Sequence, residues 1–175
     1  ASLKNVLDDE FEVFLPAVHK KLVSKIDGTV KYLFELRDGH CVEGVVMHYH
    51  HGHSMCLSTQ VGCRMGCSFC ATGMGGLIRN LTAGEILSQI TAAQRDLGIR
   101  ISNLVLMGMG EPLDNYQNTL RFLELVLADN HLNIGARHIS LSTCGVVDKI
   151  KDLGEKGSGL TLSVSLHAPN DQIRN

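Results

Sequence analysis

The first part of the chain has the hydrophobic spacing of a helix. Between residues 1 and 26, apolar side chains recur every three or four positions, as in an amphipathic helix. Pro16 interrupts this pattern, because proline cannot donate the backbone hydrogen bond of a helix interior. We therefore expect two short helical segments. The apolar positions of the first are Leu3, Val6, Leu7, Phe11 and Phe14.

From residue 29 the pattern changes to that of β-strands. Residues 29–36 and 41–49 are rich in β-branched and aromatic side chains, and the Asp-Gly pair at 38–39 between them is typical of a hairpin turn. The His-Gly pair at 51–52 marks a second turn, which leads into a strand at 55–60. The sequence thus predicts a β-meander that leads into a core domain.

From about residue 56, strands and helices alternate. One helix begins after Thr82, which can form a capping box with Glu85, and ends at Gly98. Alternation of this kind implies a parallel sheet with right-handed crossovers. The other expected elements are strands at 103–107, 138–143 and 160–166, and helices at 115–128 and 147–154.

These elements predict an α/β fold in two parts. Residues 1–54 form an N-terminal helical and β-hairpin extension, and residues 55–175 form the N-terminal half of a partial (β/α) barrel. A full barrel needs about eight strand–helix units, and only four such strands are predicted. We therefore expect a barrel truncated after the fourth strand, with the C-terminal part absent from this chain.

Composition limits the location and the partners. The 175 residues are 44% apolar with a formal net charge of −2, so the chain can build a core and is not a basic nucleic-acid binder as a whole. It contains no run of 18 apolar residues and no start resembling a signal peptide, so we expect no membrane association. Three of the six cysteines fall within eight residues, which favours metal ligands in a reducing cytoplasm over a disulfide scaffold.

The sharpest chemical signal is the C-x3-C-x2-C motif of Cys63, Cys67 and Cys70. A [4Fe–4S] cluster usually takes about four thiolate ligands, so three cysteines leave one iron open to a small molecule. Gly62 and Gly66 would let the loop wrap closely around such a cluster.

Two other uses of these cysteines compete with a cluster. A zinc ion could take the same three thiolates plus Cys56 or a nearby histidine, although structural zinc motifs usually come as two separated pairs. A thioredoxin-like pair of Cys67 and Cys70 would leave Cys63 without a role. The sequence favours the cluster, with zinc as the alternative.

Small and polar residues follow the ends of the later predicted strands. Ligands of such folds gather at the carboxyl ends of strands, so these residues and the cysteine loop would share one rim. There Glu111 offers a carboxylate to an ammonium group. The candidates at the strand ends are Gly110, Glu111, Ser142, Ser165, Leu166 and His167.

Taken together, these motifs resemble one enzyme family. The runs STQVGCRMGCSFCATG, RNLT, MGMGEP, LSTCGV and SVSLHAPN are similar to those of the radical SAM (S-adenosylmethionine) methyltransferases that act on carbon 2 of adenine in 23S ribosomal RNA and transfer RNA. The resemblance covers roughly residues 20–175. The cysteine motif alone indicates only the radical SAM superfamily, whereas the joint set is specific. The implied fold is a partial (β/α) barrel of the radical SAM type.

The resemblance implies a cofactor site. Cys63, Cys67 and Cys70 would hold the [4Fe–4S] cluster, and SAM would chelate the open iron through its amino and carboxylate groups. Phe69 would lie near the adenine of SAM. Reductive cleavage then yields a 5′-deoxyadenosyl radical, and an external reductant such as a flavodoxin or ferredoxin supplies the electron. The remaining matches to SAM-binding positions are Gly110, Glu111, Ser142, Ser165, Leu166 and His167.

The resemblance also implies two catalytic residues. In this family the methyl group first sits on a cysteine of the C-terminal part, which has no counterpart in this chain. Glu43 matches the residue that removes the proton from the substrate carbon. Cys56 matches the cysteine that resolves the adduct by forming a disulfide with the methyl-carrying cysteine. We therefore expect this chain to bind the cluster and SAM but not to methylate alone.

Two alternative functions stay open. One is the sibling family that methylates carbon 8 of adenine, although the runs at 60–62 and 65–66 look more like the carbon-2 group. The other is a non-catalytic RNA-binding module stabilised by zinc or by a cluster. Among the other residues, we expect the histidines at 48–53 to lie in a solvated loop. We expect Cys41 and Cys144 to be small, buried hydrophobic residues.

Overall fold

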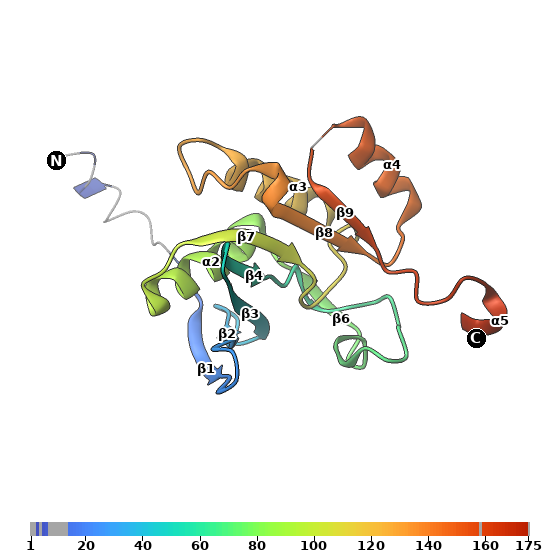
Figure 1. The fold of residues 1–175 in the computed structure, drawn as a ribbon, viewed down its shortest axis with the longest axis horizontal. Helices are drawn as coiled ribbons and strands as arrows, with labels where there is room; N and C mark the ends of the chain where they lie inside the picture. The colour runs from blue at the N-terminus through green and yellow to red at the C-terminus, as the bar shows by residue number, and fades with distance from the viewer. Residues whose placement is uncertain (1–2, 4, 7–13, 158, 175) are drawn as a thin grey trace.

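The computed structural model describes residues 3, 5–6, 14–157 and 159–174, which build a mixed sheet of seven strands and a separate two-stranded hairpin (Figure 1). The order of the large sheet is β1-β2-β3-β4-β7-β8-β9. Its strands are β1 (Ala17–Val23), β2 (Val30–Glu35), β3 (Cys41–Tyr49), β4 (Gly52–Cys56), β7 (Ile101–Leu106), β8 (Ile139–Thr143) and β9 (Thr161–Val164).

Strand β4 joins two halves of different topology. From β1 to β4 neighbouring strands are antiparallel, whereas β4, β7, β8 and β9 are parallel. Parallel neighbours need long connections, and helices provide them here. These are α2 (Ala83–Leu97), α3 (Tyr116–Leu127) and α4 (Val147–Glu155), and a short α5 (Asp171–Arg174) follows β9. The predicted β-meander and the predicted α/β array are both confirmed.

The hydrophobic core lies between the large sheet and its helices. Period-two alternation sends every second residue of a strand to the same face, as in β2, where Val30, Tyr32 and Phe34 are buried and Lys31 is exposed. The parallel strands contribute apolar residues in the same way. Fully or nearly fully buried members include Met55, Leu104, Leu106, Ile139 and Leu141 from strands, and Ile86, Ile90, Phe122 and Val126 from helices. Within the residues described above, no helix is long and apolar enough to cross a membrane.

The prediction of a helix between Pro16 and residue 26 was wrong. Residues 17–23 form strand β1, which pairs antiparallel with β2 along its length. Its side chains are all exposed, so the apolar spacing does not mark a buried helical face. Pairing covers the edge of β2, and this tertiary gain outweighs local spacing. Of the first predicted segment, positions 3 and 6 are helical, whereas 7 and 11 lie outside the described residues.

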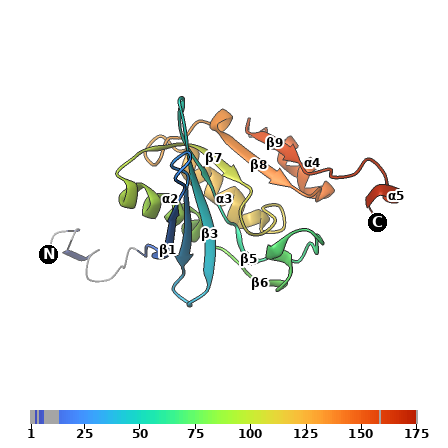
Figure 2. The same cartoon turned by 60° about the horizontal axis from the view of Figure 1, so that its bottom comes forward.

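The strand predicted at 55–60 also differs from the one observed. Strand β4 ends at Cys56, and the chain then leaves the large sheet. It forms β5 (Gln60–Gly62), which pairs antiparallel with β6 (Leu77–Asn80). This hairpin carries the cysteine loop and projects from the sheet toward the side on which β7, β8 and β9 end (Figures 1 and 2).

Helix α2 begins and ends as the sequence predicts. The Thr82 hydroxyl accepts a hydrogen bond from the Glu85 backbone at 3.2 Å, and the Glu85 carboxylate accepts one from the Thr82 backbone at 2.9 Å. Gly98 closes the helix in a left-handed conformation with φ of 65°. Because Arg79 also pairs with Glu85 at 2.8 Å, this cap joins the helix to the end of the cysteine hairpin.

We expect Thr82→Ala to lower the free energy of unfolding by about 1 kcal/mol, because the Glu85 backbone donor loses the hydroxyl that caps it. For a domain of this size that loss corresponds to about 2–4 °C in the thermal midpoint. Thr91→Ala is the matched control, since Thr91 lies within the same helix and alanine is the better helix former. Equal midpoints for the two variants, measured by circular dichroism, would show that the cap contributes nothing.

Candidate functional site

The cysteine loop closes on itself through backbone hydrogen bonds. The Cys63 backbone donates to the Gly76 carbonyl at 3.0 Å, across the mouth of the loop. Within the loop, Cys70 donates to the Cys67 carbonyl at 3.0 Å and Gly73 donates to the Cys70 carbonyl at 3.1 Å. All three cysteines are half-buried, free thiols. Each of the three thiols is therefore partly covered by protein and partly open to solvent.

Glycine is required where the loop begins. Gly62 has φ of +76°, and a Cβ atom there would lie 2.0 Å from the Gly76 carbonyl oxygen. Any side chain would thus collide with the backbone that closes the loop. Gly66 differs, because a Cβ atom there would meet nothing within 4 Å. Its φ of +69° lies in the left-handed region, which favours glycine.

The three thiols lie close enough to influence one another. Partial burial raises the pKa of Cys63, and the neighbouring Cys67, Cys70 and Glu111 raise it further. An iron centre offsets this cost, because metal coordination deprotonates a thiol outright. A positively charged group that several thiolates share, as the irons of a cluster are, would stabilise the thiolate forms in this loop.

The described part of the chain contains no set of three or more His, Cys, Asp or Glu side chains gathered closely enough for one metal ion. Two of the histidines at 48–53 contact each other, since Nδ1 of His48 lies 2.8 Å from Nδ1 of His53. These two residues lie opposite each other near the β3–β4 turn, at the start of β4 and beside the start of its parallel neighbour β7.

An aromatic contact joins the cysteine loop to the end of β9. The rings of Phe69 and His167 have centroids 4.6 Å apart and planes inclined by 49°. Phe69 is 68% exposed, so its other side is open. His167 has a positive φ of 57°, which turns the chain where it leaves the sheet. Two residues that are 98 positions apart in the sequence, and that were both predicted to bind SAM, therefore touch.

Serine hydroxyls line the adjoining face of β8 and β9. Oγ of Ser142 lies 3.3 Å from Oγ of Ser165, and Oγ of Ser140 lies 3.3 Å from Oγ of Ser163. The Ser165 backbone also donates to the Thr143 carbonyl at 2.9 Å, which holds it beside β8 beyond the last strand pair. The structure thus brings together the predicted Ser142 and Ser165, and Leu166 follows them as an exposed side chain.

Glu111, predicted to offer its carboxylate to an ammonium group, is held in place by backbone hydrogen bonds. Its side chain is buried, and both carboxylate oxygens accept backbone hydrogen bonds, from Leu113 at 3.0 Å and from Cys144 at 2.8 Å. The carboxylate therefore ties the end of β7 to the end of β8. A carboxylate has about four lone-pair sites, more than these two backbone hydrogen bonds use. Gly110, with φ of +98°, packs against Gln60.

Cys144 is a neighbour of the site that the sequence analysis missed. It was predicted to be a small buried hydrophobe, but it is exposed at the end of β8. Partial desolvation raises the pKa of its thiol to about 12, and Glu111 and then Cys67 and Cys63 raise it as well. Its position two residues after Ser142, on the predicted rim, was a signal that could have placed it there.

Glu43 and Cys56 share the sheet face that lies opposite the helices. Cys56 pairs with Val45, two residues along β3 from Glu43. Burial raises the pKa of the Cys56 thiol, which also receives a hydrogen bond from the Met107 backbone. Glu43 forms an ion pair with Lys31, whose Nζ lies 2.7 Å from its carboxylate. Both residues are therefore set back along the sheet from the cysteine loop.

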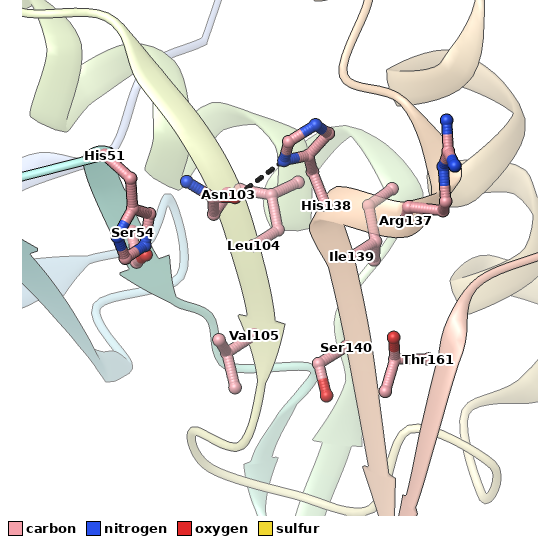
Figure 3. A pocket seen from close by; sticks show the side chains of 10 residues that line it. All are labelled: His51, Ser54, Asn103, Leu104, Val105, Arg137, His138, Ile139, Ser140 and Thr161. Atoms are coloured by element: carbon pink, nitrogen blue, oxygen red, sulfur yellow. Dashed lines mark hydrogen bonds between the residues drawn. The ribbon is translucent and has the colours of Figure 1, made fainter. Parts of the chain in front are cut away.

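A separate cavity of about 190 Å³ opens at the other end of the parallel strands (Figure 3). Here Nδ1 of His138 lies 2.8 Å from Oδ1 of Asn103, at the start of β8 and beside the start of β7. His51 from the β3–β4 turn lies at its other side. Because strand starts and strand ends are at opposite edges of a parallel sheet, this cavity is distinct from the rim that carries the cysteine loop.

Comparison with known proteins gives a consistent result. Residues 57–175 match the model of the radical SAM superfamily. Over 171 residues the chain is 61% identical to a "Probable dual-specificity RNA methyltransferase RlmN" of Clostridium botulinum (strain Langeland), covering 98% of this chain and 50% of that protein. A relative of the same name from Clostridium novyi is 57% identical over 173 residues, covering 99% of this chain and 50% of that protein. The chain thus spans about half the length of these relatives.

A solved structure shares the fold. The crystal structure of a radical SAM methyltransferase from Sphaerobacter thermophilus superimposes with a TM-score of 0.91 at 42% sequence identity, covering 99% of this chain and 52% of that one. The expected partial barrel of the radical SAM type is thereby confirmed. Radical SAM methyltransferases use a [4Fe–4S] cluster and SAM. The chain belongs to the radical SAM superfamily.

Proposed function

We propose that this chain is part of a radical SAM enzyme that methylates carbon 2 of adenine in 23S ribosomal RNA and in transfer RNA. The observation that carries the proposal is the contact between Phe69 of the cysteine loop and His167 after β9. This contact places the cysteine motif and the motif SVSLHAPN, which are far apart in the sequence, at the same rim. The relatives named as dual-specificity RNA methyltransferases support the RNA substrates.

At this rim each residue has a role that its contacts support. Cys63, Cys67 and Cys70 hold the cluster, which when bound supplies the electron that cleaves SAM. Phe69 and His167 form an aromatic wall, and such a wall suits the adenine of SAM because stacking is tolerant of the exact base. Hydroxyl and backbone groups would bind the polar remainder of SAM. These come from Gly110, Glu111, Ser142, Ser165 and Leu166.

Glu111 combines a structural and a binding role in this proposal. Its two backbone hydrogen bonds hold the carboxylate in one orientation, so no side-chain freedom is lost when a ligand arrives. The SAM amino group would donate to a remaining lone pair, in a charge-assisted hydrogen bond.

The substrate base would approach the face of the sheet that lies opposite the helices, where Glu43 and Cys56 are located. Glu43 would remove the proton from its carbon 2, and the ion pair with Lys31 holds the carboxylate on that face. Cys56 would resolve the adduct by attacking the methyl-carrying cysteine. That cysteine belongs to the C-terminal part of the family, so we propose that methylation needs a polypeptide that includes this part. We also propose that an external flavodoxin or ferredoxin supplies the electron and that the enzyme acts in the cytoplasm.

We expect anaerobically reconstituted chain to be brown and to contain iron and sulfide in near-equal amounts, whereas Cys67→Ala is colourless. Removal of one of three thiolates leaves too few ligands for the cluster. Cys144→Ala is the matched control and should keep its iron, because Cys144 lies beside the motif without belonging to it. Stoichiometric zinc in a colourless parent chain would support the non-catalytic module instead.

We expect Gly62→Ala to lose most of its cluster after reconstitution, because a Cβ atom would displace the Gly76 carbonyl that closes the loop. Gly75→Ala is the matched control, since a Cβ atom there meets nothing within 4 Å. Iron content and far-ultraviolet circular dichroism measure the cluster and the fold separately. A Gly62→Ala chain with parental iron content would contradict the role assigned to loop closure.

In a polypeptide that also supplies the C-terminal cysteine, we expect Cys56→Ala to keep its cluster and cleave SAM but to stall as a covalent protein–RNA adduct. Without Cys56 no thiolate can attack the linking sulfur. Because burial raises the pKa of this thiol, resolution by the parent enzyme should become faster as the pH rises. Gel mobility after reaction with RNA detects the adduct. Turnover without a trapped adduct, or loss of iron, would exclude the resolving role.

A further inference from the structure

Gln60 has no role in the proposed chemistry, yet both the oxygen and the nitrogen of its side-chain amide form hydrogen bonds. It is the first residue of β5, it is fully buried, and it lies three positions before Cys63. Its Oε1 accepts a hydrogen bond from the Glu111 backbone at 2.8 Å. Its Nε2 donates to Oδ1 of Asn80 at 2.8 Å and to Oδ2 of Asp114 at 2.8 Å. A buried amide that is completely satisfied fixes the groups around it.

The partners of Gln60 come from the two segments that must meet at the rim. Asn80 ends β6, the strand that returns from the cysteine loop. Glu111 and Asp114 belong to the turn that follows β7. Gly110 of that turn is in direct contact as well, because a Cβ atom there would lie 2.5 Å from the Cβ atom of Gln60. Gln60 is therefore the point at which the cysteine hairpin packs against the Gly110–Glu111 turn.

The network continues from Asp114 into the cysteine loop itself. Oδ2 of Asp114 accepts from Gln60 and also from Nε of Arg64, at 2.9 Å. Arg64 is the residue that follows Cys63. A chain of hydrogen bonds thus runs from the cysteine loop through Arg64, Asp114 and Gln60 to the backbone of Glu111.

We propose that Gln60 is a positioning residue which, through Asp114 and Arg64, sets the spacing between the cysteine loop and the Gly110–Glu111 turn. SAM has to reach both at once, because its amino and carboxylate groups bind the open iron while the turn binds the amino group. Chelation of this kind depends on distance, and a misplacement of about 1 Å can cost about 100-fold in a preorganised site. The inference rests on the assignment of the cluster and SAM to this rim.

Three changes test the network at different points. Gln60→Glu keeps the size of the side chain but places a second carboxylate against Asp114, so the two segments should separate. Adding Asp114→Asn restores one carboxylate and one amide at this contact. Arg64→Ala cuts the link to the loop at an exposed residue. Its matched control is Arg121→Ala, since Arg121 is similarly exposed and forms an ion pair of the same 2.9 Å length with Glu124, within helix α3.

The measurements are the thermal midpoint of the apo chain, iron per chain, the SAM dissociation constant of the reconstituted chain, and its EPR spectrum with and without SAM. We expect Gln60→Glu to keep its iron but to raise the SAM dissociation constant about ten-fold and to weaken the EPR change that SAM causes. The double variant should recover most of the affinity. Arg64→Ala should bind SAM more weakly than Arg121→Ala does.

Unchanged SAM affinity in Gln60→Glu would overturn the inference. So would a fall in thermal midpoint and iron content that the double variant shares, because Gln60 would then only hold the fold together. A parent chain that takes up no cluster, or a cluster whose EPR spectrum SAM leaves unchanged, would instead refute the cofactor assignment. The two failures are therefore distinguishable.

Discussion

The structure depends on how the buried chain between β4 and β5 satisfies its backbone. Residues 58–60 are buried and lie outside the strands of the large sheet, so backbone groups of other loops and buried side chains together supply their hydrogen-bond partners. Gln89 of α2 accepts from the Ser58 backbone at 3.1 Å and donates to its carbonyl at 2.9 Å. Asn115 donates to the carbonyls of Thr59 and Leu81, at 2.8 Å and 2.7 Å. This buried hydrogen-bond network fixes the point at which the cysteine hairpin leaves the core.

The same hydrogen-bond network ties the loops of the site to the sheet. The Ser58 hydroxyl donates to the Glu43 carbonyl at 2.6 Å and accepts from the Met109 backbone at 2.8 Å. One buried hydroxyl therefore connects the strand that carries the proposed base with the turn proposed to bind SAM. Loops usually move more than the elements they join, and these hydrogen bonds attach two such segments to strand β3 and to each other.

The sequence predicted the large elements well because each has a strong local signal. Helix α2 has a capping box and a terminal glycine, and β8 alternates strictly between buried and half-buried positions. Strand β1 was missed because only its pairing with β2 determines it. The strand β5 has three residues, too few to show a period. At the site, residue types predicted the chemistry, whereas the buried state of Glu111 and the nearness of Cys144 depend on contacts across strands that no local pattern contains.

The division between core and site follows from a single property of strands. In β8, Ile139, Leu141 and Thr143 face the helices and are buried, while Ser140 and Ser142 face the other way. A shift of one residue in the pairing of β8 would exchange the two sets. It would bury the serine hydroxyls and expose leucine and isoleucine, so packing opposes the shift. The apolar face thus holds the register that keeps Ser142 opposite Ser163 and within reach of Ser165, and core packing thereby positions the polar rim.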